Sequence, residues 1–270
     1  MERQSRAVLR APELADWALA HGRASLTSAE IVELLDVPED QVRRRLHAPA
    51  RRHEWVTPTR GLWVPVPPEY RSWGAPPGIE IVDAMMRHRK IDYYVGWLSA
   101  AALYGAGHQA PQVFQVAVNR QMRDRQIGRT RFVFAQRDVG RIPTADHTTR
   151  SGSTRVSSVA ATMFDVADDV ERAAGLDNVA TVILELVEHE SFDVADLAQL
   201  APRFPAAAGR RVGRLLEHHG WSDDLDLEPL RLVVRDAVPS PSRLDPASPD
   251  RGFLDPTWMV RVNTDVTDES

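Results

Sequence analysis

The sequence predicts a mixed α/β (α+β) fold in two domains. Three observations support this prediction. Patterns typical of helices and of short strands alternate along most of the chain. Residues 66–78, VPPEYRSWGAPPG, hold four prolines and two glycines, as a linker does. The length of 270 residues exceeds one average domain. We therefore expect one domain over residues 1–68 and a larger mixed α/β domain over residues 69–270.

The composition argues against several classes of protein. No apolar run approaches the roughly 18 residues that a membrane-spanning helix needs, so we expect no contact with a membrane. Glu13 and Asp16 interrupt the N-terminal stretch where a secretion signal would be apolar, so we expect no such signal. Cysteine is absent, which excludes disulfides and thiolate zinc sites and fits a cytoplasmic location.

The first domain begins with two predicted helices. Residues 12–21 read as a short helix between a proline and a glycine. A second helix starts in TSAEIVELLDV. Thr27 or Ser28 can cap its first turn, and Glu30 stands at the third position of a capping box.

A third helix and a hairpin follow. A tight connection through residues 36–37 leads to a helix that begins at Pro38, in PEDQVRRRLHAPARRHEW. Residues 55–56 and 62–64 are β-prone runs around a Thr-Pro-Thr-Arg-Gly turn. Helix, helix, short turn, helix and hairpin is the order of a winged helix-turn-helix.

The third helix carries most of the residues expected to contact double-stranded DNA. Val42 and Leu46 lie four residues apart and should pack on the core, so the opposite side points outward through Arg44. In a helix-turn-helix the N-terminal residues of this helix reach base edges, where Gln suits adenine and Arg suits guanine. Flanking arginines suit phosphates. The expected DNA-binding residues are Gln41, Arg43, Arg44, Arg45, Arg51, Arg52 and, at the tip of the wing, Arg60.

A solvated helix face is the alternative explanation of these arginines. Such a face usually mixes charges of both signs. Residues 41–60 instead contain six arginines and one acid, Glu54. DNA binding therefore explains the stretch better than solvation alone.

Charge is also distributed unevenly along the whole chain. Residues 1–155 contain 23 Arg and Lys against 16 Asp and Glu, a net charge of +7. Residues 156–270 contain 10 against 22, a net charge of −12. This asymmetry indicates a nucleic-acid contact surface at the N-terminal end, with chance clustering as the alternative.

A second basic segment lies in the second domain. Residues 119–141 hold seven arginines and two aspartates. One interpretation is protection of a sheet edge by charge. The other is an accessory nucleic-acid surface, in which Arg123, Arg125 and Arg129 would be the contacts.

The remainder of the second domain reads as alternating elements. We expect strands at 113–118 and 130–135, joined by a basic turn, and a last strand with Trp258, Val260 and Val262 on one face. Expected helices cover 79–90, the stretch GWLSAAALYGAG, 159–175 capped by Ser157 or Ser158, and regions near 178–190 and 206–219.

The sequence contains no recognisable catalytic or metal-binding motif. It has no GxSxG, P-loop or HExxH pattern. A nuclease of the PD-(D/E)xK type needs a lysine two residues after its acid, and the only lysine, Lys90, comes two residues after His88 instead. We therefore expect a protein without catalysis, metal or cofactor.

Four segments together resemble the AbiEi-type antitoxins of type IV toxin–antitoxin systems. TSAEIVELLDVPEDQVRRRLHAPARRHEWVTPTRGLWVPVP resembles their winged-helix start, and YYVGWLSAAALYGAGHQAPQVFQVAV the start of their second domain. TRVSSVAATMFDVAD is similar to their capped helix with an aspartate, and LDPASPDRGFLDPTWMVRVN to their terminal segment. The segments occur in the same order and span most of the chain.

The resemblance implies a transcriptional autorepressor that binds inverted repeats in its own promoter. It also implies an antitoxin against a co-encoded nucleotidyltransferase-like toxin, in many cases without a stable complex. The DNA-binding role would fall on Gln41, Arg43, Arg44, Arg45 and Arg60. Two alternatives stay open: a winged-helix transcription factor that senses a small ligand, and a nucleic-acid-processing enzyme.

Overall fold

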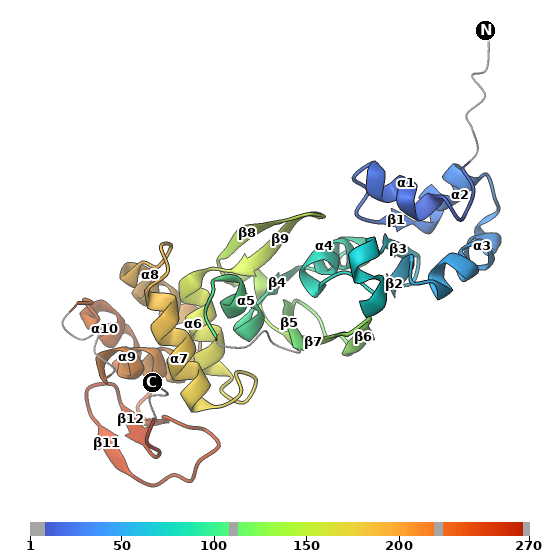
Figure 1. Cartoon of the computed structure of the whole chain (residues 1–270). Coiled ribbons are helices and arrows are strands. Elements are labelled where there is room, and N and C mark those ends of the chain that lie inside the picture. The colour runs from blue at the N-terminus through green and yellow to red at the C-terminus, as the bar shows by residue number, and fades with distance from the viewer. Residues whose placement is uncertain (1–8, 108–112, 219–223, 267–270) are drawn as a thin grey trace.

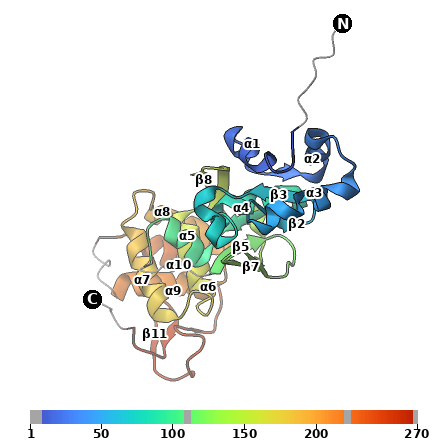
Figure 2. The same ribbon diagram turned by 45° about the vertical axis from the view of Figure 1, so that its right-hand side comes forward.

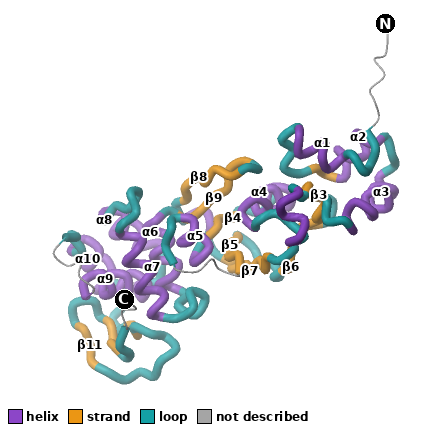
Figure 3. The backbone as a smooth tube through the Cα atoms, viewed as in Figure 1, coloured by secondary structure: helices purple, strands orange, loops and turns teal. Residues whose placement is uncertain are grey.

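The computed structural model describes residues 9–107, 113–218 and 224–266, which form an elongated molecule. The chain runs in order along it, from the blue N-terminal elements at one end to the orange and red C-terminal elements at the other (Figure 1). Strands gather mainly in the middle, between two largely helical ends (Figure 3). The predicted mixed α/β fold is confirmed, with a helix-rich N-terminal region before a larger part that contains the main sheet.

The N-terminal region has the expected order of three helices and a hairpin, with one further strand, β1, that the sequence did not predict. These are α1 (Leu14–Ala20), β1 (Leu26–Thr27), α2 (Ser28–Leu35), α3 (Glu39–Arg51), β2 (Trp55–Thr59) and β3 (Leu62–Pro65). The three strands form a sheet in the order β1-β3-β2. The predicted capping box is confirmed, because the Glu30 N–H donates to Thr27 Oγ1 and the Thr27 N–H donates to Glu30 Oε2.

Strand β3 contributes to two hydrophobic cores at once. Trp63 packs into a core with the apolar faces of α1, α2 and α3. Its neighbours Leu62 and Val64 point the other way, because successive side chains of a strand alternate, and belong to the core beneath the main sheet. The expected linker is not extended throughout, since it contains the 3₁₀-helix η1 (Pro68–Trp73).

The middle of the molecule is a six-stranded mixed sheet in the order β6-β7-β5-β4-β9-β8. Helix α4 (Gly78–Arg89) packs on one face, between the sheet and the N-terminal strands (Figure 2). The strands and the other short elements are β4 (Tyr93–Val95), α5 (Trp97–Leu103), β5 (Val113–Val118), β6 (Arg125–Ile127), β7 (Thr130–Gln136), η2 (Val139–Arg141), β8 (Thr144–Thr149) and β9 (Gly152–Ser157).

Two sequence expectations differ from this arrangement. The basic turn expected between residues 118 and 130 contains strand β6, so β5 and β7 pair in parallel instead of forming a simple hairpin. The helix expected over 159–175 ends at Asp168. The Arg172 N–H donates to Asp169 Oδ1, a local side-chain bond that competes with continued helix.

The C-terminal part packs helices on the other face of the main sheet, and a small sheet lies against α9. Its elements are α6 (Val159–Asp168), α7 (Leu176–Val187), α8 (Val194–Leu200), η3 (Ala201–Arg203), α9 (Ala206–Leu216), α10 (Glu228–Arg235), β10 (Ser242–Arg243), β11 (Phe253–Asp255) and β12 (Val260–Val262). Ser158 caps α6 through the Ala161 N–H, as expected. The expected helix near 206–219 is observed as α9, and its last expected residue lies outside the described residues.

Candidate nucleic-acid interface

Helix α3 presents its arginines because its apolar residues fix its orientation. Val42 and Leu46 are buried against the N-terminal core, as expected from their spacing. Asp36 adopts a left-handed conformation that ends α2, and α3 starts three residues later at Glu39. The connection is therefore short, and it fixes how the two helices are joined.

The first arginines of α3 lie on its exposed side. Arg43, Arg44 and Arg45 are exposed, and Arg44 Nη2 donates to Gln41 Oε1 at 3.3 Å. Within the described ranges, none of these three arginines forms an ion pair with an acidic side chain. Apart from the Arg44 group that donates to Gln41, their guanidinium donors are therefore free to bind an external acceptor such as a phosphate or a base edge.

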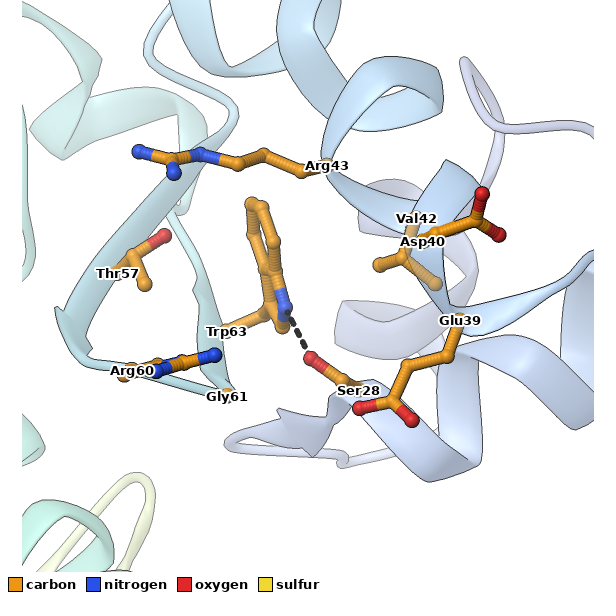
Figure 4. Close-up of a pocket in the computed structure, with 9 residues that line it drawn as sticks. All are labelled: Ser28, Glu39, Asp40, Val42, Arg43, Thr57, Arg60, Gly61 and Trp63. Carbon is orange, nitrogen blue, oxygen red and sulfur yellow. Dashed lines mark hydrogen bonds between the residues drawn. The ribbon is translucent and has the colours of Figure 1, made fainter.

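A hollow of about 980 Å³ separates the start of α3 from the β2–β3 hairpin. Arg43 reaches into it from α3, and Arg60 reaches into it from the tip of the hairpin, with Trp63 between them (Figure 4). Trp63 Nε1 donates to Ser28 Oγ at 3.1 Å, which ties this side chain to the first turn of α2. The hollow is lined by Ser28, Glu39, Asp40, Val42, Arg43, Thr57, Arg60, Gly61 and Trp63.

The two arginines at the end of α3 differ from each other. Arg51 is exposed and has no acidic partner among the described residues. Arg52 donates from Nε and Nη2 to the two carboxylate oxygens of Glu54, at 2.7 and 3.1 Å. This hydrogen bonding raises the pKa of Arg52. Arg52 is therefore already engaged inside the protein, whereas Arg51 is available.

The second basic segment reaches the hairpin through one of its residues. Arg123 and Arg129 are exposed on either side of β6, at the edge of the main sheet. Arg125 is partly buried, and its Nη1 donates to the Pro58 carbonyl of β2 at 2.5 Å. Desolvation by burial, followed by repulsion from Arg89, lowers the pKa of Arg125. Arg125 thus has an intramolecular partner, unlike Arg123 and Arg129.

The part of the chain that follows the β2–β3 hairpin and α4 is similar to a known family. Residues 94–218 match a family model described as the AbiEi antitoxin C-terminal domain. Residues 94–218 are thus similar to this antitoxin domain, and we call them the AbiEi domain. The resemblance to AbiEi-type antitoxins seen in the sequence is thereby confirmed, and α1 to α4 with the β2–β3 hairpin precede the matched residues.

A solved structure shares the fold over nearly the whole chain. The crystal structure of the RV2827C protein from Mycobacterium tuberculosis superimposes with a TM-score of 0.65 at 15% sequence identity. The likeness covers 93% of this chain and 90% of that one. At this identity it shows a common fold only. No curated protein is similar enough in sequence to count as a match.

The AbiEi domain contains a buried polar cluster that the sequence interpretation missed. The Tyr94 hydroxyl donates to Asp165 Oδ1 at 3.0 Å, and the other oxygen of Asp165 has no described partner. Desolvation by burial raises the pKa of Asp165 to about 7. The guanidinium carbons of Arg137 and Arg172 lie 5.4 and 5.1 Å from the ring centroid of Trp97. The signal in the sequence was an aspartate inside the otherwise apolar MFDVA of α6.

Two further features are absent from residues 9–107, 113–218 and 224–266. In these ranges no three His, Cys, Asp or Glu side chains come together in a way that would hold a metal ion. The helices in the same ranges are too short or too polar to cross a bilayer.

Proposed function

We propose that this chain is a DNA-binding autorepressor and an antitoxin, in which α2, α3 and the β2–β3 hairpin act as a winged helix-turn-helix. The observation that carries the DNA-binding part is the set of exposed arginines on α3 that lack acidic partners within the described residues. Val42 and Leu46 are buried on the opposite face of the helix, and this burial gives the arginines a fixed direction. The AbiEi antitoxin domain supports the antitoxin part.

In this proposal Gln41 and Arg44 read bases, since they lie near the start of α3 and already contact each other. Arg43, Arg45 and Arg51 bind phosphates beside them. Arg60 at the hairpin tip grips the DNA backbone or enters the minor groove. Arg123 and Arg129 extend the contact along the duplex. Arg52 contributes least, because Glu54 already holds its guanidinium.

The antitoxin activity is proposed to counteract a co-encoded nucleotidyltransferase-like toxin in the cytoplasm, without catalysis by this chain. Protection of cells from that toxin by co-expression tests this half. Protection that persists when the α3 arginines are replaced would assign it to the AbiEi domain alone. No protection would leave a repressor without an antitoxin role.

The DNA-binding half is tested by titrating the DNA upstream of the chain's own gene, and a random duplex, at several salt concentrations. The wild-type chain should prefer the upstream DNA. Arg44→Ala should lose about 1–3 kcal/mol of binding free energy on that site, while binding to random DNA changes less. Arg51→Ala and Arg60→Ala should each lower the slope of log K against log salt by about one.

Arg235→Ala is the matched control, because Arg235 is an exposed arginine on α10 in the acidic half of the chain. It should bind DNA as the wild type does. Equal losses on random and upstream DNA for Arg44→Ala would contradict a base-reading role. Absence of any preference by the wild type would contradict the repressor itself.

A further inference from the structure

Three backbone carbonyls near the tip of the β2–β3 hairpin are each held by a donor from elsewhere. Arg125 Nη1 donates to the Pro58 carbonyl at 2.5 Å. His88 Nε2 lies 3.0 Å from the Arg60 carbonyl and, because a carbonyl only accepts, donates to it. The Ser28 N–H donates to the Gly61 carbonyl at 2.9 Å. We call His88 and Arg125, which lie outside the N-terminal region, the clamp residues.

The clamp acts where the hairpin ladder is weakest. The register of β2 on β3 shifts between Val56 and Thr59, which leaves the intervening residues out of the regular ladder. Pro58 lies in this irregular stretch and has no N–H to give. Its carbonyl accepts a hydrogen bond from Arg125, so the second part of the chain supplies a donor to this irregular stretch.

Side-chain packing also holds the hairpin, on the side that faces α4. Leu62 and Val64 are buried in the core that α4 forms with the main sheet. His88 lies near the end of α4, and its ring lies 3.6 Å from where a side chain on Gly61 would begin. Gly61 has a left-handed φ of +80°. A two-stranded hairpin is marginally stable by itself, and β1 pairs with it through Leu26 and Thr27 alone, so these outside contacts restrict the tip further.

We propose that His88 and Arg125 are positioning residues that hold the hairpin tip in place, so that Arg60 meets DNA without prior ordering. The inference rests on the proposed DNA-binding function. Neither side chain contacts DNA in it. Fixing a contact segment in its bound conformation strengthens binding because the cost of ordering is removed. Since Arg125 belongs to the matched AbiEi residues, the antitoxin domain would directly set the DNA affinity of the N-terminal region.

The test uses the full chain and the upstream duplex, with four variants at the clamp. Arg125→Ala and His88→Ala should each weaken binding about three- to tenfold, as expected for loss of a hydrogen bond that fixes a contact segment. The salt slope should stay at the wild-type value, because no phosphate contact is removed. Arg125→Lys and His88→Gln keep a donor and should recover part of the affinity.

A double-mutant cycle separates positioning from general damage. Once Arg60→Ala has removed the contact, Arg125→Ala should cost little more, so the two losses are non-additive. Gln126→Ala is the matched control, because Gln126 is exposed on the same strand and bonds to Gly128 instead of the hairpin. It should bind as the wild type does.

Amide hydrogen exchange without DNA gives an independent readout. Exchange of the β2–β3 amides should be faster in the two alanine variants than in the wild type, while α3 amides stay unchanged. The inference would be overturned if both alanine variants exchanged their β2–β3 amides and bound DNA as the wild type does. A salt slope lowered by about one in Arg125→Ala, with losses additive to those of Arg60→Ala, would overturn it by making Arg125 a phosphate contact. A wild-type chain without DNA binding would instead defeat the proposed function, and the exchange rates would still report on the clamp.

Discussion

Helices α3 and α9 both carry clustered arginines, and the fold uses the two clusters in opposite ways. Arg43, Arg44 and Arg45 of α3 are exposed. Arg210 and Arg211 of α9 are 0% and 6% exposed. In the sequence the two stretches look alike, as QVRRRL and GRRVGRL. The difference shows that clustering of arginine alone does not identify a nucleic-acid surface.

Converging carbonyl groups explain why the α9 arginines are buried. Arg210 donates to the carbonyls of Val234 and Arg235 at the end of α10 and to those of Val238 and Ser240 beyond it. The last carbonyls of a helix lack partners within the helix and carry partial negative charge. Within the described residues, Arg43, Arg44 and Arg45 make no hydrogen bond to a backbone carbonyl, so their guanidinium groups remain available for external anions.

Among the substitutions that test this comparison of α3 with α9, replacing Arg210 should lower stability the most. Arg210→Ala leaves at least four carbonyls without their donor and should lower the free energy of unfolding by about 3–5 kcal/mol. The same substitution at Arg44 should change it by less than about 0.5 kcal/mol, since that side chain is exposed. Urea denaturation of both variants measures the two losses of unfolding free energy. Similar losses would contradict the proposed difference between the α3 and α9 arginines.

The second-largest expected effect is a dependence of stability on pH that comes from the buried carboxyl of Asp165. Its folded-state pKa of about 7 lies above the value near 4 of an unfolded chain, so the folded protein binds this proton more tightly. The contribution of Asp165 to the free energy of unfolding is therefore fully present below pH 4. Between about pH 4 and pH 7 this contribution falls by roughly 2–4 kcal/mol. Above pH 7 it stays constant.

Asp165→Asn should remove this slope, which urea denaturation at pH 5, 6 and 7.5 measures. Asp236→Asn is the control, because the Asp236 side chain is 90% exposed, and it should keep the wild-type slope. A slope that persists in Asp165→Asn would assign the pH dependence to other groups.

The smallest effect should distinguish Arg51 from Arg52 within α3 itself. Arg52→Ala removes a guanidinium that Glu54 already holds, so its loss of DNA affinity should be smaller than that of Arg51→Ala, roughly twofold or less. Arg51→Ala should lower the salt slope by about one, and Arg52→Ala should not. Salt titrations of DNA binding by the two variants measure both slopes. Equal slopes would mean that Arg52 releases Glu54 when the protein binds DNA.

The N-terminal region could be predicted closely because its signals are local. Thr27 and Glu30 define a capping box within four residues, and the four-residue spacing of Val42 and Leu46 fixes the buried face of α3. The exposed positions of Arg43, Arg44 and Arg45 follow from that spacing. Their contact with DNA stays a prediction.

The remaining features depend on contacts between residues far apart in the sequence. The bond from Arg125 to Pro58 joins residues 67 positions apart, and the bond from Tyr94 to Asp165 joins residues 71 positions apart. Composition places Arg125 in a basic segment but cannot distinguish a solvent-facing arginine from one that satisfies a distant carbonyl. Strand β8 was missed because its exposed, polar Thr144–Thr149 lacks the apolar alternation of a half-buried strand.

Strand β3 also limits how this chain can be recombined with others. A chimera joined after residue 68 would carry Leu62 and Val64 without the α4 surface that covers them, at a cost of about 1.5–3 kcal/mol for each side chain. A graft that extends through α4 would keep them covered on the α4 side, but would cut that helix from the main sheet. Exchange of the first 68 residues between related chains therefore requires matched changes at β3 and α4. These two elements should vary together when the N-terminal regions of such proteins are exchanged.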